Sequence, residues 1–148
     1  MRTLGIQIGG AVQLRSEDTR ITIDISQAKR GGSHAPYQLR AAGQDSVGRF
    51  SGENNSVHFL NVDEFKTALE AFLKARQGSA TLRAPHDCEL EFFRWNTKGD
   101  IGVRFAIGTQ FMEGEAGHYS KLVASGKFKL HGEFAEQMAA QLLEVLNA

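Results

Sequence analysis

Residues 89–108, ELEFFRWNTKGDIGVRFAIG, contain the pattern that decides the fold. Leu90 and Phe92 alternate with two glutamates, and the second run, IGVRFAIG, alternates large apolar residues with small or charged ones. A period of two is typical of a β-strand with one buried face. The polar stretch NTKGD between the runs suits a four- to five-residue hairpin loop, with Gly99 available for a left-handed position. The stretch therefore predicts two antiparallel strands joined by a short turn.

The same alternation predicts strands on both sides of this hairpin. The clearest is residues 21–26, where three isoleucines alternate with polar residues. The other predicted strands lie at residues 4–14, 37–39, 47–56, 79–84 and 121–130. No internal repeat is evident in the sequence. About eight strands in hairpin-like succession predict a mainly antiparallel sheet.

Two segments instead have helical periodicity. The first follows Asn61, which stands in capping-box spacing with Glu64, and Gly78 is its expected C-terminal cap. Its predicted buried stripe is Val62, Phe65, Leu69, Phe72 and Leu73, and that of the C-terminal helix is Phe134, Met138, Leu142, Val145 and Leu146. The sequence thus predicts a single α+β domain over residues 1–148, with two amphipathic helices packed on a mainly antiparallel sheet.

Composition narrows the class of protein. The 148 residues include 17 Lys and Arg and 17 Asp and Glu, so the formal net charge is zero and no nucleic-acid partner is expected. The N-terminus has no continuous apolar stretch typical of a signal peptide, and no run is long enough for a membrane span. Cys88 is the only cysteine, which fits a reducing compartment. We therefore expect a soluble, cytoplasmic protein.

Candidate catalytic groups are scattered. The HExxH, GxSxG, P-loop and GxGxxG patterns are all absent. A lone thiol in His86-Asp87-Cys88 is more often a small buried group than a nucleophile. Glu89 and Glu91 are expected on the solvent side of the hairpin, and the loop with Glu113, Glu115 and His118 reads as a solvated acidic loop. No catalytic residue, metal or cofactor is predicted.

Three residues are candidates for contact with a partner: Arg94 and Trp95 at the end of the hairpin, and Tyr119 in a later loop. Trp, Tyr and Arg are enriched at binding hot spots, because rigid rings and guanidinium groups give large contact areas. The alternative is that Trp95 packs with Phe93 under a helix or on the other sheet surface.

The segment from Phe50 to Gly108 resembles the WapI-type family of bacterial immunity proteins. The shared features are the stretch Phe50-Ser51-Gly52, a helix with Phe65 and Leu69, Gly78 before a strand, Gly102-Val103, and GKFKLHGEF before a C-terminal helix. The resemblance implies a non-enzymatic protein that protects its host by binding a cognate secreted toxin. It carries over no catalytic residue and no binding residue.

Two other functions stay open. One is a small-molecule-binding or enzymatic module on a concave sheet face, with Arg104, His58 or His86 as polar anchors. The other is self-association through an exposed edge strand at residues 36–40, so that the chain is a monomer or a homodimer.

Overall fold

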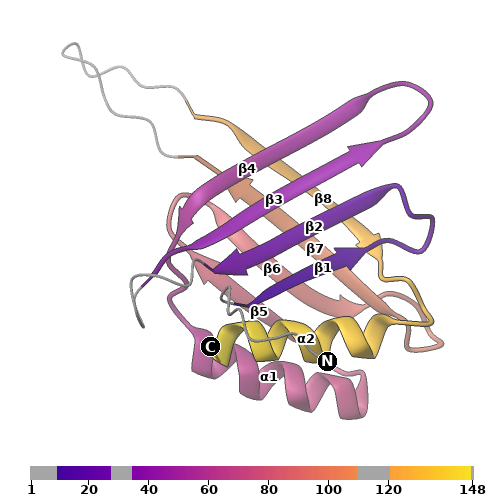
Figure 1. Cartoon of the computed structure of the whole chain (residues 1–148). Helices are drawn as coiled ribbons and strands as arrows, with labels where there is room; N and C mark the ends of the chain where they lie inside the picture. The colour runs from indigo at the N-terminus through magenta and orange to yellow at the C-terminus, as the bar shows by residue number, and fades with distance from the viewer. Residues whose placement is uncertain (1–9, 28–34, 110–120, 148) are drawn as a thin grey trace, which may run out of the picture.

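The computed structural model describes residues 10–27, 35–109 and 121–147. This part of the chain forms two four-stranded antiparallel sheets, each followed by one helix (Figure 1). The first half comprises β1 (Ala11–Arg15), β2 (Ile21–Gln27), β3 (Tyr37–Gln44), β4 (Arg49–Val57) and α1 (Val62–Ala75). The second comprises β5 (Ser79–Ala84), β6 (Cys88–Arg94), β7 (Ile101–Gly108), β8 (Val123–Lys129) and α2 (Ala135–Asn147). The predicted α+β fold with eight antiparallel strands and two helices is confirmed, and neither described helix is long and apolar enough to cross a membrane.

The structure contains a repeat that the sequence does not reveal. In both halves the strands pair in chain order, and equivalent residues line up across each sheet. One inward-facing row reads Leu14, Ile23, Ala41, Gly52, and its counterpart reads Leu82, Leu90, Phe105, Gly126. Both rows end in a glycine on the last strand of the sheet. The two rows thus share register and burial, and side-chain size differs clearly only between Ala41 and Phe105.

Each helix packs on the half of the chain to which it does not belong. Helix α1 follows β4 but packs against β5, and α2 follows β8 but packs against β1 and β2. Matching backbone bonds lead into the helices: Leu60 N donates to Arg83 O at 2.8 Å, and His131 N donates to Arg15 O at 2.9 Å. Both helices lie on the same side of the sheets (Figure 1). Because of this exchange, neither half covers its own first strand.

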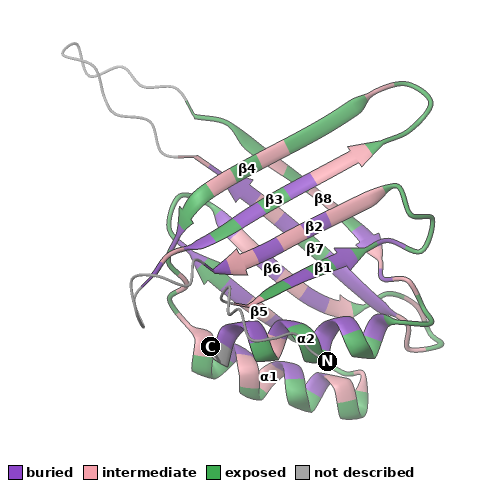
Figure 2. Ribbon diagram, in the orientation of Figure 1, coloured by how far each residue is buried: buried purple, intermediate pink, exposed green. Residues whose placement is uncertain are grey.

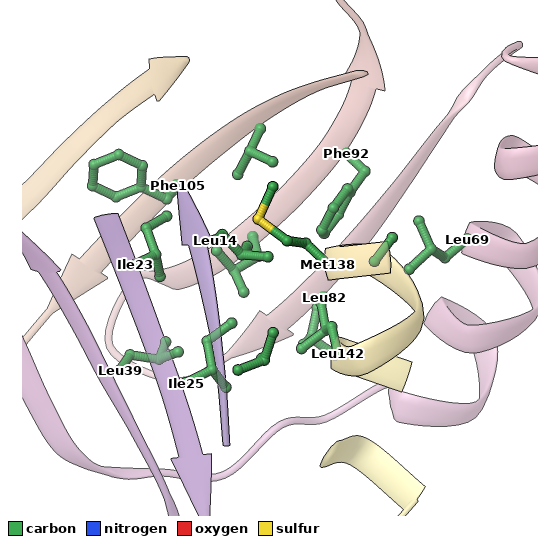
Figure 3. Packing of buried hydrophobic residues seen from close by; sticks show 14 of the residues in the cluster. Leu14, Ile23, Ile25, Leu39, Leu69, Leu82, Phe92, Phe105, Met138 and Leu142 are labelled. Carbon is green, nitrogen blue, oxygen red and sulfur yellow. The ribbon is translucent and has the colours of Figure 1, made fainter. Parts of the chain in front are cut away.

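The core is continuous across both sheets and both helices. Figure 3 shows Met138 and Leu142 of α2 between side chains of the two sheets, with Leu69 of α1 close by. Fully buried large side chains come from every layer, including Phe65 and Phe72 of α1 and Phe92 of β6. Burying one such side chain stabilises the fold by about 1.5–3 kcal/mol. The alternating apolar residues of the strands thus face one shared interior.

The predicted caps of the first helix are wrong. Asn61 makes no capping hydrogen bond; its side chain instead donates to Thr81 O at 2.8 Å and accepts from Arg83 N at 2.9 Å. The helix ends at Ala75, and Arg76 rather than Gly78 is the left-handed C-cap residue, with a φ of 54°. The Asn61 amide can satisfy both an N–H and a C=O of the adjacent sheet, whereas a cap would use only its oxygen.

Other local predictions also need correction. Residues 36–40 are not an edge strand, because β3 pairs with both β2 and β4. Phe134 is predicted in the buried stripe of the C-terminal helix, but it precedes α2 and is 37% exposed. The strand predicted over residues 121–130 begins only at Val123, and Leu122 before it is 70% exposed. Residues 4–9 of the first predicted strand lie outside the described residues.

Candidate functional site

The two sheets approach each other closely where β4 and β8 cross. A Cβ atom on Gly52 would lie only 2.5 Å from the Cβ of Ala124, so this approach requires glycine at position 52. Both strands are the last of their sheets, and both lie on the side away from the helices (Figure 1). The helices therefore cover one side of the interior, and β4 and β8 limit it on the other.

A groove of about 630 Å³ opens beside this crossing, between the two sheets. We call it the inter-sheet groove. Ile21, Ala41 and Phe105 contribute apolar surface to it, and Asp18, Arg20, Asp45 and Lys127 contribute charges. Its remaining lining comes from the end of β3, the start of β4 and the first half of β8.

Two of the lining residues are apolar and exposed. Phe50 of β4 is 71% exposed and Val123 of β8 is 46% exposed. Figure 2 shows that β4 is exposed along most of its length. Large apolar side chains grouped on two edge strands beside a groove are typical of a contact surface, whereas isolated exposed ones are ordinary.

The turns that frame this groove are held by their own carboxylates. Asp18 accepts hydrogen bonds from Ser16 Oγ at 2.6 Å and from Arg20 N at 3.1 Å. These two hydrogen bonds, the one from the Ser16 hydroxyl having the larger effect, lower the pKa of Asp18 below its ordinary value. Asp45 likewise accepts from the backbone N–H groups of Val47 and Gly48. Each of these two turns is thus held by hydrogen bonds within the turn.

The predicted partner-binding residues lie elsewhere. Arg94 donates to Asn96 O and Thr97 O, so it holds the β6–β7 turn. Trp95 is 38% exposed, and its ring centroid lies 6.0 Å from that of Phe93.

Trp95 and Phe93 both lie against the face of Gly102, where a Cβ would come within 2.8 Å of either ring. This is the outer face of the second sheet, opposite buried Phe92, so Trp95 packs with Phe93 on a sheet surface and not under a helix. Neither Arg94 nor Trp95 lines the inter-sheet groove. Tyr119 lies outside the described residues.

The thiol of Cys88 is not arranged as a nucleophile. It is buried, it donates to Gly108 O at 3.4 Å, and burial raises its pKa. Asn54 Nδ2 contacts the sulfur at 3.7 Å and donates to Gly108 O at 2.7 Å. Within the described residues no hydrogen bond joins the thiol to the His86 ring, so nothing there acts as its base.

The proposed polar anchors are only partly brought together. His58 and His86 line a second groove, of about 540 Å³, on the other side of the β4–β8 crossing. Arg104 is remote from it: its guanidinium lies 4.4 Å from the centroid of the Phe93 ring and pairs with Glu91.

The remaining candidate ligands are also dispersed. Glu89 pairs with Arg83 on the outer face of the second sheet. Among the described residues no cluster of three or more His, Cys, Asp or Glu side chains is suited to a metal ion. The loop with Glu113, Glu115 and His118 lies outside those residues.

No family model, no curated protein and no solved structure matches the chain. The similarity to the immunity proteins therefore stays a hypothesis. Sequence reasoning missed Phe50 and Val123 as surface residues. One signal was present: Phe50 is a single large apolar residue in the polar run GRFSGENNS, which does not alternate as a buried strand does.

Proposed function

We propose that this chain is a non-enzymatic binding protein and that a partner protein docks over the inter-sheet groove. The observation that carries the proposal is the exposure of Phe50 and Val123 on two edge strands that frame a preformed groove of about 630 Å³. Apolar anchors at the centre of a surface, with charged groups around them, form the usual anatomy of a protein interface.

The side-chain chemistry of the described residues favours binding over catalysis. The Cys88 thiol is buried and is hydrogen-bonded to a backbone carbonyl. Glu89 and Glu91 pair with arginines on the outer face of the second sheet. A binding role needs only a shaped surface with anchor side chains.

The resemblance to WapI-type immunity proteins supplies a specific form of this proposal. In that form the chain is cytoplasmic and neutralises a cognate bacterial toxin by occupying a surface that the toxin needs. The groove with His58 and His86 supports a second candidate, a small-molecule site, because two imidazoles line one groove of about 540 Å³.

The test uses a pair of matched variants. Phe50 lies at the start of β4 and is 71% exposed, and Leu60 follows the end of β4 and is 69% exposed. Phe50→Ser and Leu60→Ser therefore remove similarly exposed apolar side chains from two different places. The chain is co-expressed with each protein encoded beside it, and complexes are measured by size-exclusion chromatography with light scattering.

We expect one such protein to form a defined complex and to be less toxic to the host when the chain is present. Phe50→Ser should abolish both effects, and Leu60→Ser should leave them intact. Equal loss in the two variants, or substrate turnover by the isolated chain with no complex, would overturn the proposal. Light scattering on the chain alone also distinguishes a monomer from a homodimer.

A further inference from the structure

Next to the inter-sheet groove, on the outer face of the first sheet, three arginines surround a trough of about 770 Å³. We call it the arginine trough. Its arginines come from three separate segments: Arg20 after the β1–β2 turn, Arg40 on β3 and Arg49 at the start of β4. Asp45 is the single acidic residue that lines it. This local excess of positive charge arises only on folding, because the arginines are far apart in sequence.

The strand register explains the shape of the trough. Gln44 lies between two of the arginines, since its N–H donates to Arg20 O at 3.2 Å and it pairs with Arg49. The next row on the same face consists of the small side chains Thr22, Ala42 and Ser51, which form the floor. The row beyond contains Arg40. Rows on one face of a strand are about 6.6 Å apart, so the guanidinium groups stand around a shallow floor.

The three arginines are not equally neutralised. Arg40 is shared between two carboxylates, at 4.0 Å from Asp24 and 3.9 Å from Glu53. The guanidinium groups of Arg20 and Arg49 have neither an ion pair nor a hydrogen bond among the described residues. The Asp45 carboxylate accepts hydrogen bonds from backbone N–H groups of its own turn. Asp18 interacts electrostatically with Arg20, but its carboxylate is hydrogen-bonded to Ser16 and to the Arg20 backbone N–H and forms no ion pair with the guanidinium. The Arg20 and Arg49 guanidinium groups are thus left to bind a ligand.

We infer that the docking partner presents an acidic, extended segment, with carboxylates on Arg20 and Arg49 and an apolar side chain in the inter-sheet groove. This inference rests on the proposed function. Phe50 lines both the trough and the groove, so a single occupant can reach both. Arg20 and Arg49 lie two strands apart, about 10 Å at the backbone, and flexible arginine side chains bring their heads within the spacing of carboxylates on an extended chain.

A peptide fits these features better than a nucleic acid does. Nucleic-acid binding without sequence preference needs a longer basic track and several aromatic stacking platforms. Phe50 is the only aromatic side chain that lines the trough, and the described trough holds three arginines. The shallow floor of small side chains also leaves room for a backbone.

The inference is tested on the full chain by fluorescence anisotropy. The probe is a labelled ten-residue peptide with four glutamates and one central phenylalanine, compared with a control peptide in which glutamine replaces every glutamate. The protein variants are Arg20→Gln, Arg49→Gln and their double variant. Arg83→Gln is the control, because Arg83 is also exposed but lies on the second sheet and lines neither the arginine trough nor the inter-sheet groove.

We expect the double variant to weaken binding of the acidic peptide by about tenfold or more, and Arg83→Gln to leave it unchanged. Binding should also weaken as salt rises, because exposed charges are screened. Binding that is insensitive to both substitutions would overturn the inference. The inference would also be overturned if a ten-nucleotide single strand or inorganic pyrophosphate bound more tightly than the acidic peptide and its binding depended on Arg20 and Arg49.

The two proposals fail separately. If a co-expressed partner depends on Phe50 but not on Arg20 and Arg49, the proposed function stands and the acidic partner is wrong. If no partner depends on Phe50, the proposed function fails whatever the peptide does.

Discussion

The substitution Gly52→Ala tests whether β4 and β8 pack as closely as the structure shows. A methyl group at this position would lie 2.5 Å from the Cβ of Ala124, whereas carbon atoms in good contact are about 3.5–4.0 Å apart. Gly52→Ala therefore forces the strands apart by about 1 Å or distorts one of them, and we expect a destabilisation of about 1–3 kcal/mol. In an unstrained site, Gly→Ala would instead stabilise a protein by about 0.4–1 kcal/mol.

The assay is urea unfolding followed by circular dichroism. Gly52→Ala should lower the midpoint with an unchanged slope, and Ala124→Gly in the same chain should recover most of the loss, since it removes the other methyl group. Gly48→Ala is the matched control, because its Cβ would lie 3.5 Å from the Phe50 ring in ordinary contact. An unchanged midpoint for Gly52→Ala, or a double variant less stable than either single one, would refute the close crossing.

Three further predictions concern polar groups. Asn61→Ala should lower the free energy of unfolding in urea by about 1–3 kcal/mol, because it leaves Thr81 O and Arg83 N without these partners. A similar loss of stability in Glu64→Ala would contradict this and indicate that Asn61 and Glu64 form a capping box after all. The Gly132 N–H and Lys129 lower the pKa of Glu17, so its stabilisation is present above the ordinary value of 4.5 and is lost as pH falls through the lower folded value. The melting temperature should therefore fall less between about pH 5 and about pH 3, the range in which carboxyl groups titrate, in Glu17→Gln than in the unchanged chain. The same fall in both proteins would contradict this. A thiol reagent at pH 8 should label buried Cys88 more slowly in the folded chain than in urea, and equal rates would show that the thiol is accessible.

Local periodicity was sufficient to predict most of the elements. The isoleucines of β2 alternate with polar residues, and two of them are fully buried in one interior. The hairpin of β6 and β7 also forms as predicted, with Gly99 at a φ of 89° in its turn. These features depend on neighbours within a few residues, which a sequence displays directly.

The arrangement of these elements depends on distant contacts that periodicity does not encode. The stripe on α1 predicts a buried face, yet Phe65 and Leu69 carry no information on which sheet they cover. Asn61 could cap its own helix or bond to β5, and the second choice becomes available only once β5 lies beside it. The inter-sheet groove and the arginine trough escaped prediction for the same reason, since Arg20 and Arg49 meet only through the register of β2, β3 and β4.

The most direct test of the binding account is hydrogen exchange measured by mass spectrometry on the chain alone and with the co-expressed partner. The account predicts slower exchange in the β3–β4 turn, the start of β4 and the first half of β8, and no change in α1 and α2. Slower exchange confined to the two helices, or no change anywhere in the presence of a bound partner, would contradict it.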